Sequence, residues 1–244
     1  MKIGIISGSS LRHNALASFL NKEYEIIHFS ELELKKNEIQ NKKIKEYFTK
    51  VKLTEEEIFS GADWSNKNYK KILLPKGEIN KVPKDVVGLL DCDLVVVYGS
   101  SIIKNPLYSL LSENKLINLH LGISPEYTGA ACNFWAIHDD NINFVGGTIQ
   151  TLSEKLDLGK TIKYCYPKLD IPTFNSVNFS MEAVKETFIN LPEVIDKIDE
   201  YIENASEPDK SKLIRHSKIA DFDEKALDEF YEKKINFNNI YKRN

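Results

Sequence analysis

The chain has 244 residues, of which 42% are hydrophobic and 28% are charged, a balance typical of a globular protein with one substantial core. Its 33 basic and 36 acidic side chains leave a net charge of −3, so nothing in the bulk charge attracts nucleic acid or an anionic membrane. The three cysteines, Cys92, Cys132 and Cys165, lack CxxC spacing, and neither a disulfide framework nor a metal site is expected.

The sequence shows neither the pattern of a signal peptide nor that of a membrane-spanning segment. The amino terminus has too few apolar residues for a signal peptide, and no later run approaches 18 apolar residues. We therefore expect a cytoplasmic protein with no membrane partner. His28, His138 and His216 are scattered along the chain and are not spaced as metal ligands.

The first 60 residues predict an opening βαβ unit followed by charged helices. A β-branched run from Ile3 to Ser7 predicts a strand, a helical pattern begins at Leu11, and Glu25 to Phe29 predicts a second strand. Such a unit builds a parallel sheet. Residues Ser30 to Ser60 are rich in Lys and Glu and favour solvated helices with no catalytic role, and the run Glu55-Glu56-Glu57 fits a solvated helix face.

The middle of the chain holds the strongest strand. Asp93 to Tyr98 is a continuous apolar run, typical of a strand buried on both faces of a parallel sheet. Gly146 and Gly147 inside a further alternating stretch predict a bulge or a close backbone approach. The other elements expected here are a helix over Leu107 to Leu111 and strands over Lys115 to Leu119, Phe144 to Leu152 and Tyr164 to Leu169.

The last part of the sequence favours helices, namely one long amphipathic helix from Phe179 to Ile202 and a final helix from Glu224 to Lys234. Leu227, Phe230 and Tyr231 in the final helix could pack on the chain's own core or on a second copy in a homodimer. The fold class is therefore α/β, with a doubly wound, mostly parallel sheet over residues 1–175 and a helical C-terminal extension over residues 176–244.

Polar residues at the ends of buried strands are the first candidates for a site, because ligands of open parallel sheets bind beyond the carboxyl ends of the strands. Asn118 and His120 are two residues apart at a strand end and point to the same side. Asp157 follows in a turn that ends at Gly159.

These three residue types suit the acylation of an amine. An imidazole can take the proton of the attacking amine, an amide NH₂ can stabilise the oxyanion, and a carboxylate can orient the imidazole. No covalent nucleophile is needed. From their spacing alone, the same residues also fit structural roles: an Asn in a strand-end turn, a partly buried His whose hydrogen bonds are made within the protein, and an Asp that caps a loop.

Two motifs resemble the folate-dependent formyltransferase family. The stretch Asn118 to Gly129 is similar to that family's N-x-H-x-x-x-x-P-x-Y-x-G signature, and Leu156 to Gly159 is similar to its L-D-x-G loop. Asn133 to Ile137 and Val145 to Thr148 also resemble family segments, so that the likeness spans most of residues 1–165. The sequence differs from the family pattern at three places, which leave Asn118, His120 and Asp157 intact but change the pocket. Leu121-Gly122 stands where Pro-Ser is common, Thr128 stands where Arg is common, and Lys160 stands where Asp is common.

The resemblance implies a Rossmann-like catalytic domain over residues 1–175 that uses 10-formyltetrahydrofolate as co-substrate, without a metal. Asn118 would stabilise the tetrahedral oxyanion, His120 would handle the amine proton, and Asp157 would orient His120 directly or through water. The pterin would be held by backbone groups of the loop after the central strand, and the loop from Leu152 to Leu156 would close over it. The residues expected to bind the co-substrate are Gly99, Ser100, Ser101, Ile102, Ile103, Leu152 and Leu156.

Three acceptor amines occur in this family. Initiator methionyl-tRNA is disfavoured, because the family's tRNA enzymes carry a C-terminal β-barrel, whereas this tail is helical and without a basic stripe. Phosphoribosylglycinamide is favoured only by the turn after the first strand, whose backbone N–H groups could bind a phosphate, although a plain turn with Ser10 as helix N-cap fits equally. The glycinamide enzymes also lack the charged insertion and the long tail.

A nucleotide-linked amino sugar remains as the favoured acceptor, by elimination. The residues expected to bind it are Gly8, Ser9, Ser10, Arg12, His13 and Tyr127. A small non-sugar amine, a hydrolase that releases formate from the same folate, and a binding protein without turnover stay open as alternatives. No nucleic-acid partner is expected.

Overall fold

The computed structural model describes residues 1–33, 39–81, 88–111, 115–153, 159–169 and 175–233. Within them the main sheet consists of β1 (Lys2–Ser7), β2 (Glu25–Leu32), β3 (Lys70–Pro75), β4 (Leu94–Tyr98), β5 (Lys115–His120), β7 (Gly147–Thr151) and β8 (Thr161–Cys165). The helices are α1 (Leu11–Leu20), α2 (Lys42–Phe59), α3 (Leu107–Leu111), α4 (Cys132–His138), α5 (Ser176–Ile189), α6 (Leu191–Asp196), α7 (Ile198–Glu203) and α8 (Glu224–Glu232). A small second sheet pairs β6 (Tyr127–Gly129) with β9 (Arg215–Ser217), and single 3₁₀ turns lie at Ala62–Trp64, Glu78–Lys81, Ile142–Phe144, Lys210–Lys212 and Ile219–Asp221.

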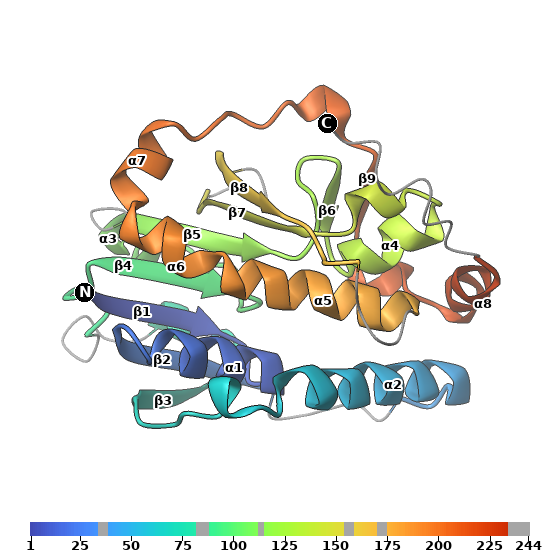
Figure 1. Cartoon of the computed structure of the whole chain (residues 1–244), viewed down its shortest axis with the longest axis horizontal. Helices are drawn as coiled ribbons and strands as arrows, with labels where there is room; N and C mark the ends of the chain where they lie inside the picture. Colours follow the sequence, from blue (N-terminus) through green and yellow to red (C-terminus); the bar gives the residue numbers. More distant parts are fainter. Residues whose placement is uncertain (34–38, 82–87, 112–114, 154–158, 170–174, 234–244) are drawn as a thin grey trace.

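The main sheet has the strand order β3-β2-β1-β4-β5-β7-β8 (Figure 1). The strands from β3 to β5 are parallel, and β7 and β8 are antiparallel to their neighbours. The predicted doubly wound, mostly parallel α/β fold is confirmed. Because the chain leaves β1 toward β2 and later resumes at β4 on the other side of β1, the strand order reverses between β1 and β4. The crevice beyond their carboxyl ends is where this fold class binds ligands.

The sheet forms because its central strands are apolar and buried on both faces. All five residues of β4 are buried, and β4 is paired on both sides, by β1 and by β5. Side chains alternate between a core under α1 and α5, which contains Val96, and a core on the α3 side, which contains Val95 and Val97. The predicted buried strand is therefore confirmed.

Strand β7 begins at Gly147, one of the two glycines for which a bulge or a close backbone approach was predicted. A Cβ atom on Gly147 would overlap the Thr187 side chain of α5, so the backbone of β7 approaches this helix directly. The pairing of β7 with β8 shifts register between Ile149 and Gln150, which is the predicted bulge. The bulge lies inside β7, where Ile149 and Gln150 face Leu119 and Asn118 of β5.

One long helix after residue 179 was predicted, and that prediction is wrong. The segment divides into α5, α6 and α7. Pro192 lies in the first turn of α6, and its missing N–H prevents α5 from continuing as one hydrogen-bonded helix. Asn175 caps the start of α5, its side chain accepting hydrogen bonds from the N–H groups of Val177 and Asn178.

The C-terminal part packs on the chain's own core. Met181, Val184 and Phe188 of α5 belong to the same buried cluster as β1, β4 and β5, and the boundary at residue 175 stays a prediction. In α8, Leu227 and Phe230 are buried, with Phe230 stacked on Phe134 at a ring-centroid distance of 4.5 Å. The tail also supplies β9, which was not predicted from the sequence, and neither were β3 and β6.

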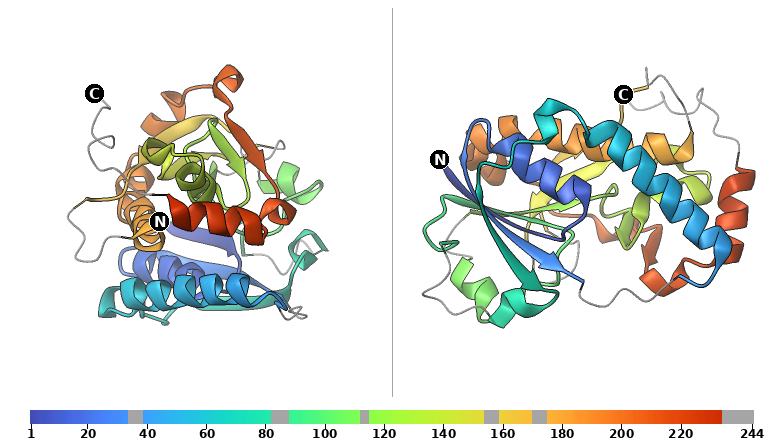
Figure 2. Two further views of the ribbon diagram at one scale, coloured as in Figure 1. Left: turned by 90° about the vertical axis from the view of Figure 1, so that its right-hand side faces the viewer. Right: turned by 90° about the horizontal axis from the view of Figure 1, so that it is seen from below.

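Helix α2, from the charged segment 30–60, contacts α5 and lies below it in the view of Figure 1, as Figure 2 also shows from two other sides. The tail crosses the top of the molecule in Figure 1 from α7 to β9 and then reaches α8, which contacts both α4 and α2. None of the described helices is both long and apolar enough to cross a bilayer. Elements from both ends of the chain thus meet around the carboxyl edge of the sheet.

Phe188→Ala tests whether α5 is part of the sheet's core. Phe188 is fully buried against the rings of Phe59 and Tyr98, so its truncation should lower the free energy of unfolding by about 3–5 kcal/mol. The adjacent Ile189 is 38% exposed, and Ile189→Ala should cost less than about 1 kcal/mol. Urea unfolding followed by circular dichroism measures both. Separate transitions for sheet and helices, with only the helical one affected, would contradict the shared core.

Candidate functional site

A cavity of about 890 Å³ opens at the carboxyl edge of the sheet. It lies beyond β4, β5 and β7, at the point where the strand order reverses. Of the residues predicted from the sequence, those that line it are Arg12, His13, Gly99, Ser100, Ser101, Ile102, Ile103, Asn118, His120 and Leu152. The structure therefore brings most of the predicted site into one cavity.

His120 is fixed by a hydrogen bond to the backbone. It ends β5, is 5% exposed, and its Nε2 lies 2.8 Å from the carbonyl oxygen of Tyr127. A carbonyl oxygen only accepts hydrogen bonds, so Nε2 carries a proton. In the neutral ring the other nitrogen, Nδ1, is then the one that can take up a proton.

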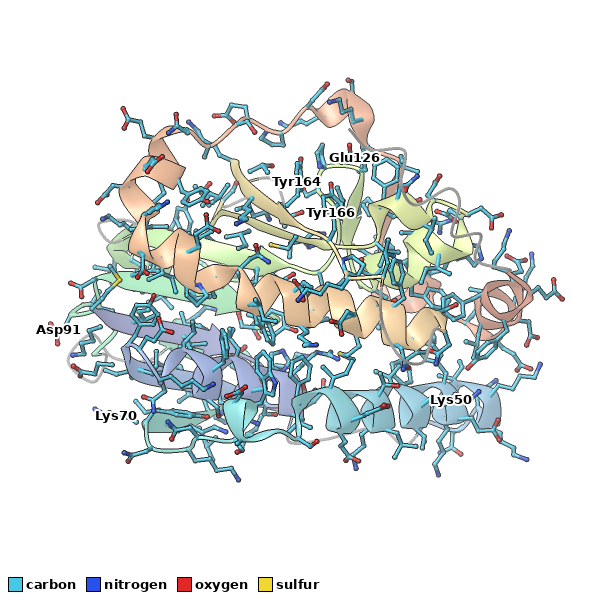
Figure 3. The ribbon with its side chains drawn as sticks, viewed as in Figure 1. Lys50, Lys70, Asp91, Glu126, Tyr164 and Tyr166 are labelled. Atoms are coloured by element: carbon cyan, nitrogen blue, oxygen red, sulfur yellow. The ribbon has the colours of Figure 1, made fainter. Side chains whose placement is uncertain are left out.

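The loop that supplies this carbonyl is held from two neighbouring strands. Thr148 of β7 lies opposite His120, and its hydroxyl donates to the Gly122 carbonyl at 2.7 Å and accepts from the Ser124 N–H at 3.1 Å. The hydroxyl of Tyr164 donates to the Ser124 carbonyl at 2.9 Å. Figure 3 labels Tyr164 on the edge strand β8, in the upper part of this view. The loop is therefore anchored before it reaches Tyr127.

Gly122 leaves the space that the His120 ring occupies. A Cβ atom on Gly122 would lie 2.8 Å from His120 Nε2 and 2.5 Å from the Cβ of Cys132. The departure from the common Pro-Ser at 121–122 is thus matched to the packing around the imidazole.

The C-terminal tail supports the same loop from its other end. Strand β9 pairs with β6, and Ile214 and Arg215 each donate a backbone hydrogen bond to the carbonyl of Glu126, which Figure 3 labels. Gly129 has φ +90°, and a Cβ atom there would overlap the Ser217 carbonyl. The strand that presents Tyr127 is therefore sandwiched between the loop after β5 and the tail.

Arg215 secures this arrangement. Its guanidinium donates two hydrogen bonds to Asp139, at 2.8 and 2.7 Å, and lies 4.3 Å from the centre of the Trp135 ring. A bidentate ion pair fixes the orientation of the guanidinium, and stacking on an aromatic ring adds a further attraction. The tail strand is thus fixed to α4.

Asn118 faces a residue that the sequence analysis missed. Across the β5–β7 pair it lies opposite Gln150, and both side chains line the cavity. Gln150 is 1% exposed. The only sequence signal was its alternation with Thr148 on a predicted strand, and the partner strand cannot be deduced from that signal.

His13 closes the bottom of the crevice between β1 and β4. Gly99 has φ +58°, and a Cβ atom there would lie 2.6 Å from His13 Nε2. His13 Nδ1 accepts a hydrogen bond from the Ser10 N–H at 3.1 Å. Burial holds the pKa of His13 well below its ordinary value, and the charges of Arg12 and His28 lower that pKa further. The ring is therefore neutral and adds no positive charge to the predicted phosphate site.

Arg12 is the cation of this part of the cavity, and it already has a counter-charge. The Arg12 guanidinium lies 3.6 Å from one carboxylate oxygen of Glu55. The backbone N–H of Arg12 donates to the other carboxylate oxygen at 2.5 Å. The prediction that Glu55 belongs to a solvated helix face is wrong, because Glu55 is buried beneath Arg12. A buried carboxylate of this kind persists because it is paired.

The remaining predicted residues lie elsewhere. Gly8, Ser9 and Ser10 form the turn before α1, and they are not among the residues that line the cavity. The Tyr127 ring is buried, with its hydroxyl accepting from the Asn141 amide at 2.7 Å, so that only its backbone carbonyl serves the site. Asp157 and Leu156 lie outside the described residues.

The far wall of the cavity is mostly apolar, with Asn133, Ser180 and Lys218 as polar members, and comes from segments to which the sequence assigned no role in the site. It is lined from α2, α4, α5 and the tail by Ile44, Tyr47, Phe48, Val51, Phe134, Val177, Met181, Val184, Ile219 and Phe222. In the part of the chain that the structure describes, no group of three or more His, Cys, Asp or Glu side chains could hold a metal ion.

His13→Gln should make the protein less sensitive to acid. The pKa of His13 is lowered in the folded protein. Below a pH of about 6.5 the unfolded chain therefore binds a proton that the folded chain does not, and the free energy of unfolding decreases as the pH is lowered. Glutamine keeps an acceptor but cannot be protonated. Between pH 6.5 and pH 5 the wild type should lose about 2 kcal/mol more than the variant. Urea midpoints at the two pH values measure this, and equal losses would contradict a neutral His13.

Comparison with known proteins supports the fold. No family model matches the sequence, and no curated protein matches it. Among solved structures, a sugar N-formyltransferase from Shewanella has a TM-score of 0.54 at 18% identity, with 91% of this chain and 78% of that chain covered. A phosphoribosylglycinamide formyltransferase from Anaplasma phagocytophilum has a TM-score of 0.56 at 16% identity, with 82% and 87% covered. An N-formyltransferase from Helicobacter canadensis, solved with folinic acid and dTDP-3-aminofucose, has a TM-score of 0.52 at 13% identity, with 97% and 76% covered. The chain therefore has the fold of these formyltransferases.

Proposed function

We propose that this protein is an enzyme that transfers a formyl group from 10-formyltetrahydrofolate to the amino group of a nucleotide-linked amino sugar. The observation that carries the proposal is the placement of Asn118 and His120 on one face of β5, both lining a cavity of about 890 Å³. A volume of this size falls in the upper part of the range for small-molecule sites. The shared fold with solved formyltransferases supports the reaction class.

The reaction begins with attack of the neutral amine on the formyl carbon. The carbonyl oxygen becomes an oxyanion, which the Asn118 amide NH₂ stabilises by a hydrogen bond. His120 takes the proton of the attacking amine at Nδ1, since Nε2–H is bonded to the Tyr127 carbonyl. The carbonyl then re-forms, the bond from the formyl carbon to N10 breaks, and the proton passes from His120 to N10. The products are the formamide and tetrahydrofolate.

Asp157, taken from the L-D-x-G motif, is assigned to assist His120 by stabilising the imidazolium that forms when Nδ1 takes up the amine proton, since the Tyr127 carbonyl already orients the ring. Gly159, two residues later, packs so closely on Thr151 that a Cβ atom would overlap the Thr151 carbonyl. The N–H of Thr151 donates to the Lys160 carbonyl at 2.9 Å. The carboxyl end of the loop is thus tied to the end of β7, next to Gln150 and the cavity.

The loop from Gly99 to Ile103 is suited to hold the pterin because it is braced from outside the cavity. The Ser101 N–H donates to Glu31 at 2.6 Å, and the Ile102 carbonyl accepts from Asn80 at 3.0 Å. These two groups are engaged, so the pterin would be recognised by the other backbone groups of the loop. A rigid loop costs less entropy on binding than a mobile one.

The acceptor is assigned from the cavity wall and from the comparisons. An apolar wall with Tyr47, Phe48 and Phe222 suits a flat nucleobase, and the Helicobacter canadensis enzyme was solved with a nucleotide-linked amino sugar. Phosphoribosylglycinamide is the second candidate, because a phosphoribosylglycinamide formyltransferase has the same fold. The turn from Gly8 to Ser10, expected to bind phosphate in either acceptor, does not line the cavity and so does not separate the two candidates.

Incubation with 10-formyltetrahydrofolate and a panel of nucleotide-linked amino sugars tests the proposal. We expect tetrahydrofolate release that depends on the acceptor, with a product heavier by one formyl group. His120→Ala and Asn118→Ala should each lower kcat by about 10²–10³-fold, because each removes a group that acts in the transition state.

Asn68→Ala, at an exposed position that does not line the cavity, serves as the matched control for Asn118→Ala and should retain wild-type kcat. Release of formate without an acceptor would identify a hydrolase instead. Transfer to phosphoribosylglycinamide alone would select the second candidate, and no transfer to any amine would refute the formyltransferase.

A further inference from the structure

Gln150 is a buried polar residue at the cavity that the proposed reaction does not yet use. Its side-chain oxygen Oε1 is fully shielded and has no hydrogen-bond partner among the described residues. The strand register places Gln150 directly opposite Asn118. In such a pair the two Cβ atoms lie within about 5.5 Å of each other. His120 is the diagonal neighbour on the same face.

An unpaired buried acceptor is costly to the folded protein, because it has lost its water without gaining a partner. The bulge between β7 and β8 falls at Ile149 and Gln150, and bulges near sites redirect side chains. Thr148, the next residue on the same face of β7, has both of its hydrogen bonds made within the protein. The contrast points to a partner for Gln150 that comes from a ligand in the cavity.

We propose that Gln150 Oε1 accepts a hydrogen bond from the attacking amino group and is a specificity-determining residue for the acceptor, an inference that rests on the proposed function. A primary amine that attacks through its lone pair has two N–H bonds left. One proton passes to His120 Nδ1, and Gln150 holds the other N–H opposite Asn118. The amine is thus positioned between the group that binds the oxyanion and the group that takes the proton.

An amide suits this role better than a carboxylate. An amide oxygen accepts a hydrogen bond but leaves the amine neutral and nucleophilic. A carboxylate at the same position would favour the ammonium form, which has no lone pair for attack. Gln150→Glu should therefore shift the pH profile of kcat/KM to higher pH, a shift that a purely structural role would not cause.

Gln150→Met, close in shape but without the amide, is the main test. We expect the KM for the amino sugar to rise about 10-fold or more, while the affinity for 5-formyltetrahydrofolate, measured by calorimetry as an unreactive folate probe, stays unchanged. Without ligands the variant should melt at the wild-type temperature or a few degrees above it, because an unpaired acceptor has been removed. Gln40→Met, at an exposed position, should match wild type in all three measurements.

The outcomes separate this inference from the proposed function. Formyl transfer by the wild type with an unchanged KM in Gln150→Met overturns the inference alone. A lost affinity for 5-formyltetrahydrofolate in Gln150→Met would place the residue on the folate and also overturns it. If the wild type transfers no formyl group, the proposed function fails and the amine assignment falls with it. The melting temperature tests the inference independently of activity. If ligand-free Gln150→Met melts below the wild type, Oε1 is paired within the protein and the inference is overturned.

Discussion

The hydrogen bond from His120 Nε2 to the Tyr127 carbonyl is the contact on which the site depends. It fixes which nitrogen of the imidazole carries a proton, and it links the end of β5 to β6. Strand β6 is in turn paired with β9, from the C-terminal tail. The protonation state of one side chain is therefore set by segments almost 100 residues apart, which gives the tail a role in the site that its exposed course does not suggest.

The two sides of the cavity differ in their physical character. The sheet edge presents Asn118, His120 and Gln150, whereas α2, α4 and α5 present mainly apolar side chains. Low polarity on one side strengthens the electrostatic effect of the few polar groups on the other. The buried and neutral His13 fits the same picture, because a neutral ring at the bottom of the crevice leaves Arg12 as the local positive charge.

The sequence predicted those parts of the fold that local patterns determine. The apolar run of β4 and the helix from Leu107 to Leu111 appear where they were expected, because burial and helical spacing are local signals. Asn118 and His120 share a cavity because alternation along one strand is also local. By contrast, β6 and β9 are short strands stabilised by each other across 88 residues, as in the pair Thr128 and His216.

The same distinction explains the errors at the site. Glu55 belongs to a run of three glutamates, and only the approach of Arg12 from α1 makes that position a buried ion pair. Gln150 became a candidate only once the register placed it opposite Asn118. The break between α5 and α6 was the one error that a local signal, Pro192, could have prevented.

A crystal structure of the protein with bound 5-formyltetrahydrofolate would test the account most directly. The account predicts the pteridine against the loop from Gly99 to Ile103, with the formyl-bearing side of the folate directed toward Asn118 and His120. It also predicts that the bond from His120 to the Tyr127 carbonyl persists in the complex. A folate bound outside this cavity, or a His120 ring that has left the Tyr127 carbonyl, would contradict it.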